Sequence, residues 1–150
     1  MKSEQKQLAT AIMIASISHN NQCDKGGKPY ILHPLHLMNQ LLFDPQLATI
    51  AVLHDVIEDS DATIEYLRDK GMSERVLEAL DLLTHKSGVS YATYIMDIST
   101  NYDAIRVKRK DLEHNSSITR LKGLKPKDFE RMTKYHNAFL FLGKARSDFT

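Results

Sequence analysis

Apolar side chains recur every three to four residues along most of the chain. The first such stripe consists of Leu8, Ala11, Ile12 and Ala15, which share one face of a helix that we expect over residues 3–18. The same spacing predicts further helices over residues 47–59, 73–83, 90–100, 102–117 and 126–145, with shorter ones after His33 and between residues 61 and 71. The alternation typical of strands is absent from the sequence pattern, and no repeat or linker divides the chain. The sequence therefore predicts an all-α fold, a single-domain bundle over residues 1–150 with about seven or eight helices.

The helical pattern of residues 47–59 changes character halfway along the segment. Residues 47–53 are apolar nearly all round, which is typical of a helix inside a bundle. The second half carries His54, Asp55, Glu58 and Asp59. Buried charges must be paired, protonated or bound to a metal ion, so this helix end is a candidate site. The alternative is a helix end that surfaces into a solvated acidic loop.

Other polar residues favour the first interpretation. His33 precedes Pro34, which disfavours helical geometry at His33 and indicates a defined turn. Asp111 shares a helix face with Lys108 and Asn115. Two imidazoles and two carboxylates, from His33, His54, Asp55 and Asp111, suit a divalent transition ion. Five further histidines compete for the same role, namely His19, His36, His85, His114 and His136.

Composition narrows the class of protein. The 150 residues are 42% hydrophobic and 26% charged, as in globular chains. Twenty basic and nineteen acidic residues leave a formal net charge of +1, so no overall field favours nucleic acid or membrane partners. The single cysteine, Cys23, excludes an internal disulfide framework and fits a reducing compartment. The sequence contains neither an apolar run long enough for a membrane span nor a signal-peptide core, and we expect a cytoplasmic protein.

Three segments match a known family. GGKPYILHPLHL (residues 26–37) resembles a G-x-PY-x-x-HP motif, AVLHDVIEDSDAT (residues 51–63) resembles A-x-LHD-x-(I/V)-ED-(T/S), and VKRKDLEHN (residues 107–115) resembles VKLADRLHN. These are segments of the HD superfamily of metal-dependent phosphohydrolases, in its RelA/SpoT-type hydrolase branch. The resemblance covers residues 8–140, and its three segments occur in the family's order.

The resemblance implies a site and a reaction. In this branch His33, His54, Asp55 and Asp111 would bind one divalent metal ion, usually Mn²⁺. Glu58 and Asp59 would orient or deprotonate the attacking water. The substrate side would consist of Lys25, Lys108 and Asn115. The implied activity is removal of pyrophosphate from the 3′ position of guanosine tetra- or pentaphosphate, by an all-α bundle that is often a homo-oligomer.

The chain also departs from the family pattern. Asp24 takes the place of an arginine that packs on the guanine base in the family, and Arg109-Lys110 replace an apolar pair. Two alternatives therefore stay open beside the main interpretation: a nucleoside monophosphate phosphatase of the HD superfamily, and a non-catalytic, metal-stabilised module that senses a nucleotide or binds a protein. We interpret the basic run RVKRK (residues 106–110) as a solvated helix face, because it lacks the interleaved aromatics of a nucleic-acid surface.

Overall fold

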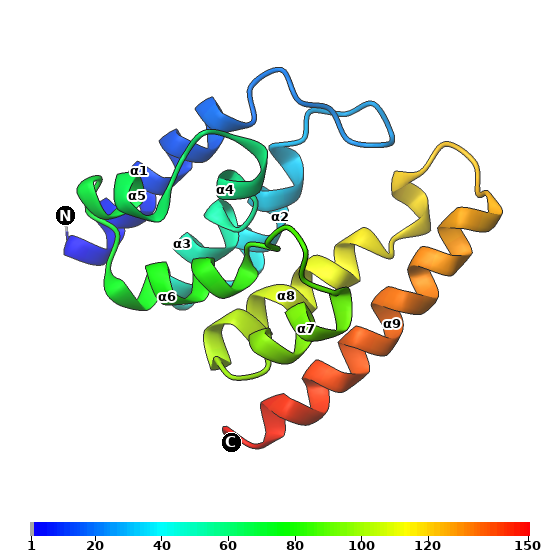
Figure 1. Cartoon of the computed structure of the whole chain (residues 1–150). Coiled ribbons are helices and arrows are strands. Elements are labelled where there is room, and N and C mark those ends of the chain that lie inside the picture. Colours follow the sequence, from blue (N-terminus) through cyan, green and yellow to red (C-terminus); the bar gives the residue numbers. More distant parts are fainter. Residues whose placement is uncertain (1) are drawn as a thin grey trace.

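The computed structural model describes residues 2–150, and the regular secondary structure in this part of the chain is helical, with one isolated bridge between Cys23 and Pro29 and no strand. The elements in chain order are α1 (Ser3–Ser18), α2 (Leu32–Gln40), α3 (Pro45–Leu53), α4 (Val56–Asp59), α5 (Ile64–Asp69), α6 (Glu74–Leu83), α7 (Tyr91–Ile98), α8 (Tyr102–Asn115), the 3-10 turn η1 (Ile118–Arg120) and α9 (Pro126–Ser147). The predicted all-α fold class is confirmed (Figure 1).

Helix α3 is the centre of the bundle. Every residue from Leu47 to Leu53 is fully buried, and α1, α2, α6 and α8 all pack against α3. The helix begins where Asp44 accepts hydrogen bonds from the backbone N–H groups of Gln46 and Leu47, with Pro45 at its first position. The surface of α3 is apolar on all sides because other helices surround it.

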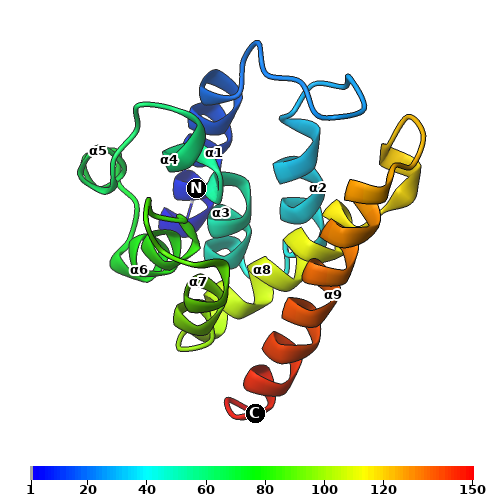
Figure 2. The same ribbon diagram turned by 45° about the vertical axis from the view of Figure 1, so that its right-hand side comes forward.

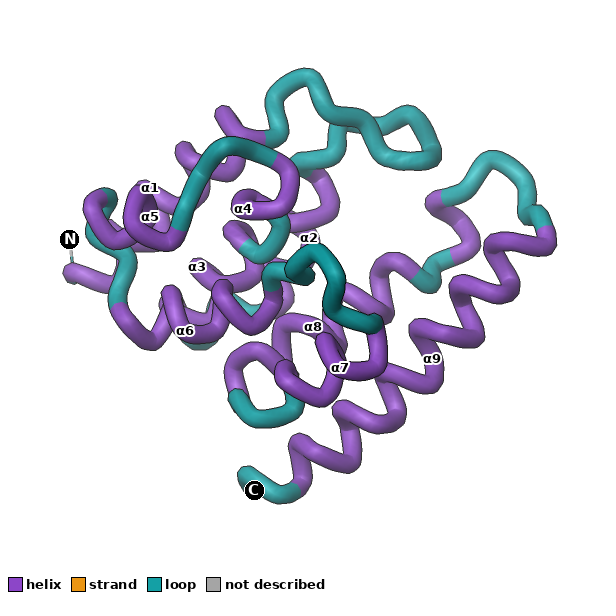
Figure 3. The backbone as a smooth tube through the Cα atoms, in the orientation of Figure 1, coloured by secondary structure: helices purple, strands orange, loops and turns teal. Residues whose placement is uncertain are grey.

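Helix α9 lies on the outside of the bundle. It packs along α8 and runs back in the opposite direction, as Figures 1 and 2 show from two angles. Its N-terminal end lies beside the long loop that joins α1 to α2, which Figure 3 shows as one of the main non-helical segments. The residues that join α8 to α9 therefore border the same region of the molecule as this loop.

Two expected boundaries were wrong, and both concern candidate site residues. The single helix expected over residues 47–59 is two helices, because the chain turns at His54 and Asp55. The side chain of His54 bonds the carbonyl of Ala51, which interrupts the regular backbone ladder. Helix α2 begins at Leu32 rather than after His33, so His33 lies in its first turn, where Pro34 removes no hydrogen bond that the helix needs. No helix within residues 2–150 has the length and apolar character required to cross a membrane.

Candidate metal centre

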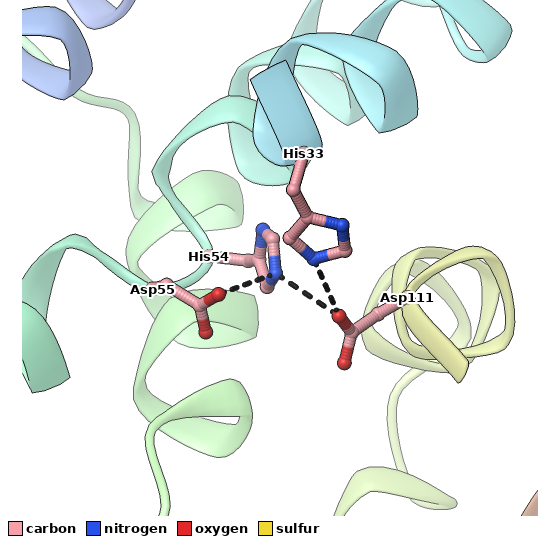
Figure 4. Close-up of side chains that lie close together, drawn as sticks. All are labelled: His33, His54, Asp55 and Asp111. Atoms are coloured by element: carbon pink, nitrogen blue, oxygen red, sulfur yellow. Dashed lines mark hydrogen bonds and ion pairs between the residues drawn. The ribbon is translucent and has the colours of Figure 1, made fainter. Parts of the chain in front are cut away.

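Four side chains from three parts of the chain converge inside the bundle. His33 comes from the first turn of α2, His54 and Asp55 from the turn between α3 and α4, and Asp111 from α8. One ligand atom from each residue lies within 4.8 Å of those from the other three. Figure 4 shows all four side chains pointing toward one another. This is the set that the sequence singled out, and the structure brings it together.

His54 presents one nitrogen to the two carboxylates. Its Nδ1 donates a hydrogen bond to the carbonyl oxygen of Ala51, at 2.7 Å. Its Nε2 lies 3.0 Å from an oxygen of Asp55 and 3.3 Å from one of Asp111, yet it is buried without a hydrogen-bond partner. Burial lowers the pKa of His54, but the two carboxylates outweigh burial and hold the pKa well above its usual value. The carboxylates therefore favour a cation at Nε2, which is either a proton or a metal ion.

Asp55 is an ionised carboxylate in this setting. Burial raises its pKa, but the adjacent His54 more than offsets burial and the pKa falls to about 2. The hydroxyl of Tyr30 donates a hydrogen bond to Oδ2 of Asp55. Tyr30 belongs to the PY pair of the first matching segment, three residues before His33, and the sequence analysis assigned it no role. It fixes the orientation of a candidate ligand.

His33 lies between Asp111 and a second histidine. Its Nε2 is 2.9 Å from Oδ1 of Asp111, and because a carboxylate only accepts, the imidazole donates this bond. Its Nδ1 is 2.7 Å from Nδ1 of His114. Burial, followed by the positive charge of Arg120, lowers the pKa of His114 to about 3, so this ring is neutral. His114 therefore orients His33 and does not itself reach the cluster of four.

Asp111 accepts more hydrogen bonds than any other candidate ligand. Lys108 donates to its Oδ2 at 2.7 Å, and Asn115 donates to its Oδ1 at 2.9 Å. Burial raises the pKa of Asp111, but Lys108 and the two histidines hold it well below the usual value. Lys108 and Asn115 were predicted to contact the substrate. In the fold, both side chains already bond Asp111 before any substrate is bound.

Glu58 and Asp59 lie in α4, beyond the cluster. Glu58 is exposed as a residue, but burial of its carboxyl end raises its pKa, and one of its oxygens accepts a hydrogen bond from the backbone N–H of His85. Asp59 accepts a hydrogen bond from Gln22 at 3.1 Å. The backbone N–H of Asp59 bonds the carbonyl of Asp55 at 3.0 Å, but neither carboxylate is among the convergent ligand groups. Both are therefore one helical turn from the cluster, at its solvent side.

A cavity of about 250 Å³ adjoins the cluster. Tyr30 and Asn115 line it, and these residues bond Asp55 and Asp111 respectively. Its other walls come from the loop between α1 and α2, the η1 region and α9, and include Lys25, Arg120, Arg131 and Tyr135. We call this cavity the basic cleft. Asp24 also lines it, where it lies 3.7 Å from the guanidinium of Arg120.

The competing histidines lie elsewhere among residues 2–150. His19 bonds Gln22, His36 bonds Gln40 and stacks on His114, and His85 bonds the carbonyl of Val89. His136 lines a separate pocket between α8 and α9. None of them offers an atom to the cluster of four. Sequence spacing left open which of the seven histidines are ligands. The packing of α2 and α8 on α3 brings only His33 and His54 to the cluster.

Comparisons with known proteins identify relatives in sequence and in fold. The chain is 32% identical over 89 residues to a guanosine-3′,5′-bis(diphosphate) 3′-pyrophosphohydrolase of Aquifex aeolicus, a match that covers 57% of this chain and 13% of that protein. It is 30% identical over 142 residues to the bifunctional (p)ppGpp synthase/hydrolase SpoT of Escherichia coli, which covers 86% of this chain and 20% of SpoT. This chain thus spans a fifth or less of the length of these relatives.

A solved structure shares the fold. It is that of a metazoan orthologue of SpoT described as hydrolysing ppGpp, and it superimposes with a TM-score of 0.74 at 18% identity, over 95% of this chain and 92% of that one. At this identity the match establishes the helical fold. No family model matches the chain.

Proposed function

We propose that this chain, a RelA/SpoT hydrolase-like protein in sequence and fold, is a metal-dependent phosphohydrolase that removes pyrophosphate from the 3′ position of guanosine tetra- or pentaphosphate. The observation that carries the proposal is the convergence of His33, His54, Asp55 and Asp111 beside the basic cleft. In this proposal residues 1–150 form one HD domain in a cytoplasmic protein, which acts on a small nucleotide and forms a homo-oligomer.

The donor set fits a divalent ion. Two imidazole nitrogens and two carboxylates are a mixed set of the kind that binds Mn²⁺, which is our proposed metal, and related ions. The unpartnered Nε2 of His54, directed at two carboxylates, is the feature that a bound cation would satisfy. When bound, such an ion lowers the pKa of a coordinated water and polarises a phosphoryl oxygen. Hydrogen bonds with Tyr30, His114, Lys108 and Asn115 hold three of the side chains in place, and the carbonyl of Ala51 holds His54.

The reaction needs a base next to the ligands. Glu58 and Asp59 are one turn along from His54 and Asp55, and the raised pKa of Glu58 suits a carboxylate that accepts a proton from water. The oxygen of water forms a bond to phosphorus, the bond from that phosphorus to the 3′ oxygen breaks, and the 3′ oxygen takes up a proton. Pyrophosphate leaves, and the 3′ hydroxyl remains on the nucleotide.

The basic cleft supplies the substrate side of the proposal. Lys25, Arg120 and Arg131 place positive charge at its wall, and Lys and Arg side chains are the usual partners of phosphate groups. Asp24 stands where the family has an arginine, but in the folded chain it pairs with Arg120, so the cleft still contains a guanidinium. Tyr135 offers an aromatic face on the α9 side.

The test combines metal analysis with a nucleotide panel. We expect the purified chain to bind about one Mn²⁺ and to release pyrophosphate from guanosine tetraphosphate. Asp55→Ala should abolish both metal content and turnover, whereas His136→Ala, outside the cluster, should keep both. Release of orthophosphate from a nucleoside monophosphate would instead support the phosphatase alternative. Metal and nucleotide bound without any turnover would support the non-catalytic module.

A further inference from the structure

A second basic pocket lies on the side of α8 that faces away from the candidate metal centre. Its volume is about 390 Å³, and it is bounded by the end of α2 and the following turn, by α8 and by the second half of α9. Four cations line it, namely Arg106, Arg109, Lys110 and Arg146. Arg109 precedes Asp111 by two positions, and this spacing directs the two side chains to opposite faces of the helix. We call this the α8–α9 pocket.

Arg109 is held in the pocket without a charged partner. Its guanidinium stacks on the ring of Phe139 with 4.1 Å between its Cζ and the ring centroid. Gly143 makes room for it, because a Cβ at that position would lie 3.1 Å from Nη2 of Arg109. Among residues 2–150 no carboxylate forms an ion pair with Arg109, and its Nε is buried with no hydrogen-bond partner. Stacking fixes the plane of the guanidinium, and its two Nη groups, which are not buried and form no hydrogen bond within this part of the chain, are the donors left for an acceptor.

Positive side chains outnumber carboxylates around Arg109. Arg106 pairs with Asp103 at 2.7 Å, and Lys110 lies 3.5 Å from Glu113. Arg146 has no ion pair within the described residues, like Arg109. The expectation that residues 106–110 form a solvated helix face was also wrong, since the side chains of Arg106 and Lys108 are only 18% and 13% exposed. Glu113 is the one carboxylate among the lining residues, so the pocket has an excess of positive charge, and two of its cations form no ion pair with any described residue.

We propose that the α8–α9 pocket is a second ligand site, for a small molecule that carries a polyphosphate group. Guanidinium and ammonium groups at fixed positions are the usual partners of phosphate, and a guanidinium edge binds it through two parallel hydrogen bonds. The volume of the pocket is within the range of small-molecule sites. Phe43, which is 74% exposed, stands at its edge and offers a face on which a base stacks. The site goes beyond the proposed hydrolase function and does not depend on it.

Calorimetry on the full chain in EDTA tests the site, with inorganic triphosphate and GTP as probes. EDTA removes metal-dependent binding at the candidate metal centre.

We expect one triphosphate to bind per chain. Arg146→Glu should weaken the affinity for triphosphate by about ten-fold or more, because a cation becomes a repelling anion. Lys144→Glu is the matched control, since it makes the same charge change two residues away on α9 but outside the pocket, and it should leave the affinity unchanged. Tighter binding of GTP than of triphosphate identifies a nucleotide as the ligand, and equal binding identifies the polyphosphate alone.

A second pair of variants separates this pocket from the basic cleft. Arg109→Gln removes the guanidinium and should abolish binding, with circular dichroism to verify the fold. Lys25→Glu alters only the basic cleft and should leave triphosphate binding intact. The proposal is overturned if triphosphate and GTP do not bind, or if Lys25→Glu abolishes binding while Arg146→Glu preserves it. Neither result bears on hydrolysis at the metal centre, which is measured with Mn²⁺ and a different substrate.

Discussion

Nε2 of His33 and Oδ1 of Asp111 lie 2.9 Å apart, although 78 positions separate the two residues in the chain. The contact exists because α2 and α8 pack both against α3 and against each other. α3 carries no polar side chain that bridges them, and His54 and Asp55 join the pair only where α3 has ended. The candidate metal centre is thus a product of how three helices pack, which gives its polar groups a fixed separation before any ligand binds.

The first prediction concerns Asp111 in the metal-free protein. Asp111→Ala removes the carboxylate that neutralises Lys108, whose side chain is only 13% exposed. Loss of one partner of a buried ion pair costs about 3 kcal/mol. We therefore expect the free energy of unfolding, measured with urea in EDTA, to fall by about that amount. Asp61→Asn, at an exposed carboxylate in the turn before α5, should change it by less than about 0.5 kcal/mol.

The second prediction concerns the stability gained from metal. Mn²⁺ at one hundred times its dissociation constant should stabilise the folded chain by about 2.7 kcal/mol, because it binds the folded state alone. His54→Gln removes a candidate ligand and should abolish this gain, whereas His136→Gln should preserve it. Thermal unfolding with and without Mn²⁺ measures both. A full metal response in His54→Gln would exclude His54 as a ligand.

The third prediction separates metal binding from proton transfer. Glu58→Gln keeps the size and hydrogen-bonding capacity of the side chain but removes its basicity, so kcat should fall by about 10²-fold or more. The metal content should stay at the wild-type value, because Glu58 is not among the four convergent side chains. Elemental analysis and initial rates on the same sample test this. Unchanged kcat would assign the base to Asp59 or to another group.

Much of the fold was predictable from the sequence, because apolar periodicity reports which face of each helix is buried. The expected helix over residues 3–18 has the observed bounds of α1, and α3 is as buried as its apolar surface predicts. The break at His54 was not predictable, since it depends on the bond from its Nδ1 to the carbonyl of Ala51. Periodicity carries no information about a side chain that competes with the backbone ladder.

The candidate site was also predictable only in part. The order of the motifs identified His33, His54, Asp55 and Asp111, and the structure brings those four together. Tyr30 was missed, because its hydrogen bond to Asp55 joins two separate segments and leaves no local pattern in the sequence. Lys108 and Asn115 share a helix face with Asp111, as their spacing indicated, and in the fold both bond it. Their role on the substrate side stays a prediction.

The fourth prediction concerns acid stability, away from the site. Burial alone would raise the pKa of Asp103, but hydrogen bonds from Arg75 and Arg106 hold it below the usual value. A carboxyl whose pKa is lowered by folding stabilises the protein above the unfolded pKa of about 3.9, and this contribution disappears as the pH falls through the folded pKa. Asp103→Asn should therefore lower the free energy of unfolding by about 1 kcal/mol at pH 7. The difference from wild type should shrink below about pH 4. A difference that stays constant from neutral to acidic pH would show that the ion pairs with Arg75 and Arg106 contribute nothing.

The last prediction tests whether the basic cleft depends on the contact between its two walls. A Cβ at Gly26 would lie 2.4 Å from the backbone carbonyl oxygen of Arg120, a distance that real structures do not allow. Since both atoms are fixed to backbone, Gly26→Ala must move the loop that carries Lys25 away from η1. We expect KM to rise by about ten-fold, because substrate-positioning groups are displaced, while the metal content stays unchanged. Lys28→Ala, in the same loop but outside the cleft lining, is the control and should retain the wild-type KM. If Gly26→Ala also keeps that KM, the nucleotide does not bind between these walls, and the substrate side of the site must be sought elsewhere.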